Sequence, residues 1–326
     1  MKLAHRCGMS YLPLWLRFAA MCLLAATTSA VAQETKAFDA GNPRTYPAGT
    51  TGCAAACEAG TIVIPLPPDG VLRFSSFKAQ GPFAISFRPN AANTPATLLV
   101  AGDVVLSAPQ CCGSVSIAGH PGEAATARGV GAGGLGGPGA FRGGRGHGQP
   151  MGIGGLTPGG NGEGPGGGWG ATTNVEAIGG TFTGTIELQP LIGGSGGGGG
   201  SGNGFEAACL GGGGGGGGGA ILIKASGRVA VQNFQIAADG GRGGEPADRN
   251  CAQGGAGGSG GAIRLVARTF SATGTARLTA RAGDPAHRGG VATAGRIRIE
   301  AEDDSVQASF TTEPVAIRTT EGPERR

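Results

Sequence analysis

Residues 211–219 are nine consecutive glycines, residues 196–200 are five more, and residues 131–170 are mostly glycine. Glycine supplies 71 of the 326 residues, about three times the share usual in globular proteins. Such runs either remain flexible loops or pack backbone against backbone as extended polyglycine II helices, with three residues per turn. Because ordering glycine costs more entropy than ordering any other residue, its recurrence at one place in each repeat favours the packed alternative.

A sequence pattern adjoining the glycine runs recurs with an offset of 42 residues. The segment 219–223, Gly-Ala-Ile-Leu-Ile, matches Gly-Ala-Ile-Arg-Leu at 261–265, and residues 236–238 match residues 278–280. A third, shorter copy begins at residue 295. Three earlier segments fit the same pattern and are again followed by glycine: residues 97–101, 104–106 and 114–118. The chain therefore has the organisation of a repeat protein.

Apolar residues alternate within each copy, which is the period of a β-strand. The alternating pairs are Ile221/Ile223, Val229/Val231, Phe234/Ile236, Ile263/Leu265, Ile297/Ile299 and Ile186/Leu188. One short strand cannot bury a core, whereas copies stacked about 4.8 Å apart can. The pattern predicts an all-β fold, a short parallel β-solenoid with glycine-rich excursions. It should be right-handed, because parallel crossovers almost always are.

The predicted organisation divides the chain into six parts. They are a signal peptide at residues 1–32, an N-terminal cap at 33–60, first β-coils at 61–119, a glycine- and proline-rich insertion at 120–180, β-coils with polyglycine loops at 181–310, and a polar tail at 311–326.

The first 32 residues have the features of a cleavable secretory signal peptide. Lys2, Arg6 and Arg17 bring positive charge to an apolar core at residues 18–26, and residues 30–32 supply a small-residue cleavage site. This core is too short for a membrane helix, which needs about 20 apolar residues. We expect an exported chain that is periplasmic, extracellular or bound at the cell surface, without a transmembrane segment once the signal is removed.

Removal of the signal peptide leaves six cysteines: Cys53, Cys57, Cys111, Cys112, Cys209 and Cys251. An even number favours disulfides in an oxidising compartment. The 42-residue offset stacks Cys209 on Cys251, within the Cα separation that a disulfide needs, so we expect this bond. Cys53 and Cys57 pair either with each other or with Cys111 and Cys112, and both alternatives stay open.

Charge gives two further indications. Without the signal peptide the chain carries 22 basic and 21 acidic groups, a net charge of +1, which does not indicate a nucleic-acid partner. The 42-residue offset also stacks Asp239 on Arg281 and Arg242 on Asp284, pairs of opposite charge such as neighbouring strands prefer.

Polyglycine followed by Gly-Gly-Ala-Ile-Arg-Leu at 260–265 and Gly-Arg-Ile-Arg-Ile-Glu-Ala at 295–301 resembles an uncharacterised family of exported bacterial glycine-rich repeat proteins. The resemblance covers residues 61–301 and implies a β-helical exported protein. It supplies no catalytic residue. A more distant likeness to parallel β-helix adhesins and polysaccharide-active enzymes rests on architecture alone.

Catalytic groups are sparse in this sequence. It has no phosphate-binding loop with a lysine, no His-Glu-x-x-His helix and no Cys-x-x-Cys pair, so we predict no cofactor and no metal. A polysaccharide hydrolase or lyase would need clustered carboxylates, for which Asp239, Asp284 and His287 are the candidates. Because both aspartates have arginine partners in the predicted register, structural ion pairing is the preferred interpretation.

The leading functional hypothesis is an exported structural or adhesive protein that is not an enzyme. Lys224, Arg264, Arg296 and Arg298 fall on the strand positions opposite the apolar ones, which predicts that their charges lie in solvent. We expect Arg264, Arg296 and Arg298 to form a binding face for a glycan, a matrix or a cell-surface partner. The alternative is a carbohydrate-active β-helix enzyme, and self-association stays open.

Overall fold

The computed structural model describes residues 36–52, 60–109, 113–148, 158–172, 174–202, 209–306 and 310–320. All of them belong to the second of two compact units, Thr35–Arg326. Their regular structure is β, with parallel sheets and, in these ranges, one short 3-10 helix, η2 (Pro43–Thr45), and no α-helix. The predicted all-β class is confirmed. The predicted signal peptide and Cys53, Cys57, Cys111 and Cys112 lie outside the described residues.

The first sheet has nine strands, all paired in parallel, in the order β10-β7-β4-β6-β9-β12-β14-β16, with β1 beside β4. Its strands are β1 (Lys36–Asp39), β4 (Val71–Gln80), β6 (Ala96–Val100), β7 (Val104–Ser107), β9 (Ala220–Ala225), β10 (Arg228–Gln232), β12 (Ala262–Thr273), β14 (Arg296–Val306) and β16 (Ile317–Thr319). The long strand β12 pairs with β9 through its first half and with β10 through its second.

The second sheet has seven strands in the order β15-β13-β11-β8-β5-β3-β2. They are β2 (Thr51–Gly52), β3 (Gly60–Pro65), β5 (Phe83–Arg88), β8 (Gly113–Ser116), β11 (Phe234–Ala237), β13 (Arg277–Thr279) and β15 (Thr311–Glu313). All pairings are parallel except that between β2 and β3. From β3 to β16 the chain alternates between the sheets, because one strand of the second sheet lies between successive passes through the first.

The predicted register is confirmed in three strands of the first sheet. Ile263 in β12 lies opposite Ile221 in β9 and Ile297 in β14. In the second sheet, Ile236 lies opposite Leu278. The strand predicted at Ile186 and Leu188 is wrong, since these residues lie in a turn and, among the described residues, the next strand begins at Ala220.

The core fills the space enclosed by the inward faces of the strands. Every second residue of β9, β10 and β11 is buried there, as the alternation predicted. Phe38 stacks on Phe77 with ring centroids 4.4 Å apart. Phe234 packs over Gly113, where an added Cβ would overlap its ring. One continuous apolar core therefore joins successive passes of the chain.

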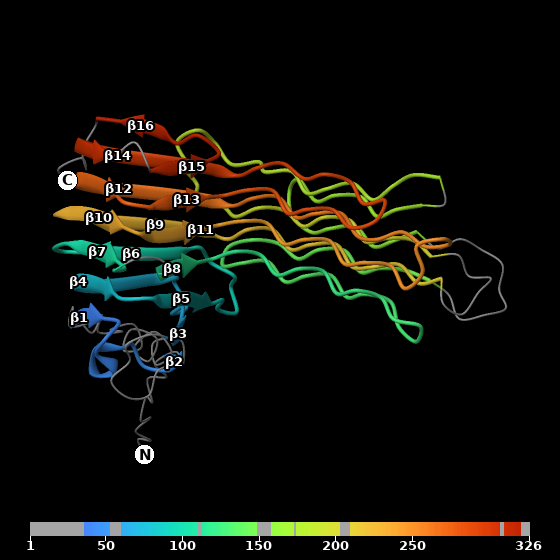
Figure 1. Cartoon of the computed structure of the whole chain (residues 1–326), viewed down its shortest axis with the longest axis horizontal. Helices are drawn as coiled ribbons and strands as arrows, with labels where there is room; N and C mark the ends of the chain where they lie inside the picture. Colours follow the sequence, from blue (N-terminus) through green and yellow to red (C-terminus); the bar gives the residue numbers. More distant parts are fainter. Residues whose placement is uncertain are drawn as a thin grey trace, which may run out of the picture. The chain divides into compact units, whose positions relative to one another are not determined.

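Glycine-rich segments connect the last strand of one pass to the first strand of the next. They are residues 117–219 between β8 and β9, residues 238–261 between β11 and β12, and residues 280–295 between β13 and β14. Figure 1 shows these segments leaving the sheets at one end, running outward side by side, and returning. Residues 181–219 contain no strand in their described part.

The backbone of residues 211–219 is fully hydrogen-bonded. Each of the nine N–H groups donates to a backbone carbonyl, and each of the nine carbonyls accepts from a backbone N–H. Every third residue bonds the same neighbour: Gly213 and Gly216 donate to Glu123 and His120, three residues apart. Six segments surround the run, namely residues 117–123, 131–137, 141–147, 194–200, 241–244 and 253–259.

This packing leaves no room for side chains. A Cβ placed on any of residues 211–219 would lie within 2.6 Å of a backbone atom in a neighbouring segment. Real Cβ atoms never approach so closely, so the close approach of these backbones requires glycine. The polar groups of the run are satisfied by other backbone groups rather than by water or side chains, as buried backbone requires.

The predicted disulfide between Cys209 and Cys251 is confirmed, with the two Cα atoms 5.4 Å apart. The predicted ion pair between Asp239 and Arg281 is also confirmed, at 3.2 Å. Arg242 and Asp284 also lie on adjacent segments as the offset predicted, since Gly243 N donates to Asp284 O at 2.9 Å and both residues line one groove. The guanidinium of Arg242 bonds Glu245 Oε1 at 3.0 Å, because that carboxylate lies one turn further along the same segment.

Candidate ligand-binding face

The outer face of the first sheet carries two rows of outward-pointing side chains. In each row the residues lie opposite one another on successive strands. One row is Val71, Thr97, Leu222, Arg264 and Arg298, and the next is Arg73, Leu99, Lys224, Val266 and Glu300. Five of these ten residues are charged, and four of the five are cations. This face is therefore the candidate binding surface.

The predicted binding residues Arg264 and Arg298 do not lie in solvent. Arg264 Nε lies 2.8 Å from Glu300 Oε1, and Arg298 Nε lies 2.7 Å from the same oxygen. The three side chains are 16 %, 14 % and 13 % exposed. The expectation of solvated charges is therefore wrong for this pair, because both guanidinium groups bond Glu300 within the protein.

A covering segment, residues 182–191, explains why these side chains are buried. Leu188 is fully buried against Ala220 and Ala262 of the sheet. The Gln189 amide, oriented with its oxygen toward Arg264, accepts from both Nη atoms at 2.7 Å. Residues 182–191 thus lie over the arginines, a contact between distant parts of the chain.

The third predicted binding residue, Arg296, is held by the same covering segment. Its Nη1 donates to the carbonyl of Gly184 at 2.8 Å, and its guanidinium lies 5.9 Å from the centre of the Phe182 ring. Such a cation–π contact adds modestly to the hydrogen bond. Arg264 and Arg296 therefore hold the covering segment in place, whereas Arg298 bonds Glu300.

Two opposing effects set the pKa of Glu300. Burial raises it, but the hydrogen bonds and positive charges of Arg264 and Arg298 outweigh burial, so the pKa of this carboxyl lies below its ordinary value. A carboxylate between two guanidinium groups stays charged at neutral pH. The sequence offered a signal for this residue, since Glu300 shares the outward phase of Arg298 two positions earlier.

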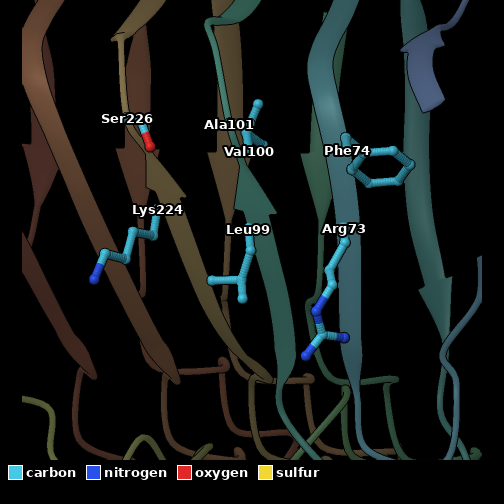
Figure 2. Close-up of a pocket in the computed structure, with 7 residues that line it drawn as sticks. All are labelled: Arg73, Phe74, Leu99, Val100, Ala101, Lys224 and Ser226. Carbon is cyan, nitrogen blue, oxygen red and sulfur yellow. The ribbon is translucent and has the colours of Figure 1, made fainter. Parts of the chain in front are cut away.

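An open groove remains on the same face, on β4, β6 and the end of β9. Arg73 and Lys224 flank Leu99, which lies between them on the central strand β6 (Figure 2). The groove encloses about 310 Å³ and is also lined by Phe74, Val100, Ala101 and Ser226. Arg73 and Lys224 are both exposed. The prediction of a solvent-facing Lys224 is confirmed, whereas Arg73 was not singled out from sequence.

A second groove, of about 260 Å³, lies between two glycine-rich segments. It is lined by Asp239, Arg242, Arg281 and Asp284 with intervening Gly240, Ala282 and Gly283. Asp239 accepts hydrogen bonds from the Arg281 backbone, the Arg281 side chain and Thr279 Oγ1, at 2.7, 3.2 and 3.1 Å. Its carboxylate is therefore occupied by structural contacts, as expected. His287, the third candidate, is not among the lining residues.

Within the described ranges, no group of three or more His, Cys, Asp or Glu side chains is arranged to hold a metal ion. In the part of the chain that the structure describes, no helix has both the length and the apolar character needed to span a bilayer.

Comparison with known proteins gives no further assignment: no family model, no curated protein and no solved structure matches the chain significantly.

Proposed function

We propose that the strands form a right-handed parallel β-solenoid continued by a polyglycine II bundle. The in-register parallel pairing of successive passes supports the solenoid. The three-residue hydrogen-bonding period of residues 211–219 and their six neighbours support the polyglycine II bundle. A molecule built this way is a rigid scaffold, because every backbone N–H and carbonyl of residues 211–219 is bonded to a neighbouring segment.

The proposed function is that of an exported structural or adhesive protein that binds an anionic glycan. The observation that carries it is the open groove in which Arg73 and Lys224 flank an apolar floor at Leu99. Export is supported by the signal-like N-terminus and by the disulfide, since disulfides persist in oxidising compartments. The proposal includes that this chain belongs to the family of exported bacterial glycine-rich repeat proteins.

The groove matches a charged polysaccharide in two respects. Arg73 and Lys224 are two strands apart, or roughly 10 Å at the spacing of a parallel sheet, so they can contact separate acidic groups on one extended chain. Leu99 between them offers an apolar surface for the C–H face of a sugar ring. Acidic groups of the polysaccharide would pair with Lys224 and with Arg73, which also lies 3.6 Å from Asp69, and a sugar ring would cover Leu99.

Charge reversal at Lys224 tests this proposal. We expect Lys224→Glu to weaken retention on immobilised polygalacturonate by about tenfold, because an acidic ligand group would then face a like charge. Retention of the wild-type protein should fall as salt increases, since salt screens exposed charges. Affinity electrophoresis through gels containing the polysaccharide measures both effects.

The matched control is Lys78→Glu, the same change at an exposed position on β4 that does not line the groove. It should leave retention within twofold of the wild type. Equal losses in the two variants, or no retention of the wild-type protein on any acidic polysaccharide, would contradict the proposal.

The same experiment examines the alternative of a carbohydrate-active enzyme. Its basis is the second groove, which places Asp239 and Asp284 in one lining. Release of reducing or unsaturated sugar by the wild-type protein would favour this alternative and make those aspartates and His287 the first residues to replace. Retention without release supports the adhesive function.

A further inference from the structure

Three neighbouring glycine-rich segments form one flat side of the bundle. The middle segment, residues 175–181, bonds residues 166–172 through Ile178 N to Trp169 O at 2.8 Å. On its other edge it accepts from residues 288–294, through Gly290 N to Ala177 O at 2.6 Å. Because its inner side is bonded to interior segments, including Gly180 N to Gly257 O at 3.0 Å, the three segments lie in one layer.

The outward positions of this layer carry mostly uncharged side chains, which together define the uncharged face. They recur every third residue, and those exposed are Trp169, Thr172, Val175, Ile178, Thr181, Arg288, Val291 and Ala294. The charged residues within the three segments are Glu176 and Arg288, both near the ends remote from the sheets. The central part of the face therefore holds no charge.

Trp169, Ile178 and Val291 lie at the same level across the face. The first two are joined by a backbone hydrogen bond, and a Cβ on Gly179 would contact the Val291 carbonyl. Their exposed fractions are 70 %, 51 % and 79 %. Three large apolar side chains in a row, exposed to water on a rigid surface, are typical of a binding site.

Other sides of the bundle have different chemistry. Residues 141–147 present Arg142 and Arg145 to solvent, and residues 238–245 present Arg242, which pairs with the partly buried Glu245. The uncharged face is thus distinct within this chain rather than a general consequence of its glycine content.

Size and chemistry together restrict what can cover this face. Six residues at about 3.1 Å each give a length of roughly 19 Å, and three segments about 4.8 Å apart give a width of roughly 15 Å. That surface, about 300 Å², is well below the roughly 800 Å² per partner of a stable protein interface. A face of this size suits a narrow polymer, and the absence of charge suits a neutral polymer.

We propose that the uncharged face binds a neutral polysaccharide. Trp169 supplies a broad, rigid ring that stacks on the apolar face of a pyranose at low entropic cost. Ile178 and Val291 extend the apolar contact, and the hydroxyl groups of Thr172 and Thr181 exchange hydrogen bonds with sugar hydroxyls. This site is separate from the cationic groove on the sheet and does not depend on the function proposed for it.

Tryptophan fluorescence tests the proposal in the exported protein. The chain has two tryptophans, and Trp15 lies in the predicted signal peptide, so Trp169 alone reports after export. Titration with soluble neutral polysaccharides, namely barley β-glucan, galactomannan and starch, should shift the emission to shorter wavelength with at least one of them. The shift should persist at high salt, because no charge is involved.

Trp169→Ala should weaken retention on the responding polysaccharide at least about tenfold, as for a central aromatic contact. Leu135→Ala is the matched control, because Leu135 is 58 % exposed on another segment of the bundle, and it should leave retention unchanged. Thermal unfolding of both variants should match the wild type, since both side chains are exposed.

Three results would overturn the proposal. One is an emission shift that follows protein concentration together with a doubled mass, which would assign the face to a second copy of the chain. Another is a shift with neutral phosphatidylcholine vesicles and with no polysaccharide. The last is no shift with any of these. If Lys224→Glu did not weaken retention on the acidic polysaccharide, that result would contradict only the proposal for the cationic groove.

Discussion

Gly215→Ala is expected to destabilise the protein severely. A methyl group at this position would overlap the carbonyl oxygen of Gly241, and the backbone of residue 215 is fixed by bonds from Gly215 N to Ala256 O and from Gly197 N to Gly215 O. Neither Gly241 nor the backbone of residue 215 can move away, because each is hydrogen-bonded to further segments. We expect the free energy of unfolding to fall by at least about 3 kcal/mol, at the upper end for overpacked sites.

Chemical denaturation followed by far-ultraviolet circular dichroism measures this loss. Gly129→Ala is the matched control, since the nearest atom to an added Cβ there is Thr126 Oγ1 at 3.8 Å. That variant should unfold at the same denaturant concentration as the wild type. If both variants were equally stable, the glycine-rich segments would not be packed as described.

The second large effect is expected at Glu300. Glu300→Gln removes the charge that two largely buried guanidinium groups share, while keeping the shape of the side chain. Leaving buried cations without a counter-charge typically costs about 3–5 kcal/mol. The loss should also loosen the covering segment at residues 182–191, because Arg264 bonds both Glu300 and Gln189.

The pH dependence of stability isolates this carboxylate. Because the pKa of Glu300 is lower in the folded protein than its ordinary value, ionised Glu300 stabilises the fold above the unfolded pKa of about 4.3. That stabilisation is lost as the pH falls through the folded pKa. Urea unfolding between neutral and acid pH should show a steep loss in the wild type that is much reduced in Glu300→Gln.

Glu313→Gln is the matched control for Glu300. Glu313 is 46 % exposed and lies 3.5 Å from Arg281 Nη1, and exposed pairs contribute about 0–1 kcal/mol. Similar losses in the two variants would contradict the central position given to Glu300.

Local repetition made the strand register predictable. The 42-residue offset placed Ile221 beside Ile263 and Cys209 beside Cys251, because both pairs follow from one spacing within adjacent copies. The offset could not predict the ion-pair partner of Arg242, since Glu245, three residues further along the same segment, competes with Asp284 on the neighbouring segment.

Long-range contacts were not accessible from the sequence. The alternation of Arg264, Arg296 and Arg298 correctly placed them on the outer face, but it could not show that residues 182–191 return to cover that face. The turn at Leu188, where the sequence predicted a strand, belongs to this covering segment. Arg73 was missed because its strand precedes the glycine-flanked copies that defined the repeat.

The glycine bundle was predictable in kind but not in arrangement. Runs of glycine favoured close backbone packing, yet identical residues carry no information about which segments become neighbours. The exposed row at Trp169 depends on segments separated by more than 100 residues along the chain, so only the fold reveals it.

Amide hydrogen exchange of residues 211–219 tests the central claim of this structure most directly. Mass spectrometry of peptic peptides that contain this run should show amides retained for at least many minutes at neutral pH, since all nine donate to backbone carbonyls inside the bundle. Amides in the exposed turn at residues 126–129 should exchange much sooner. Complete exchange of the glycine run within seconds would contradict the packed bundle and favour a flexible loop.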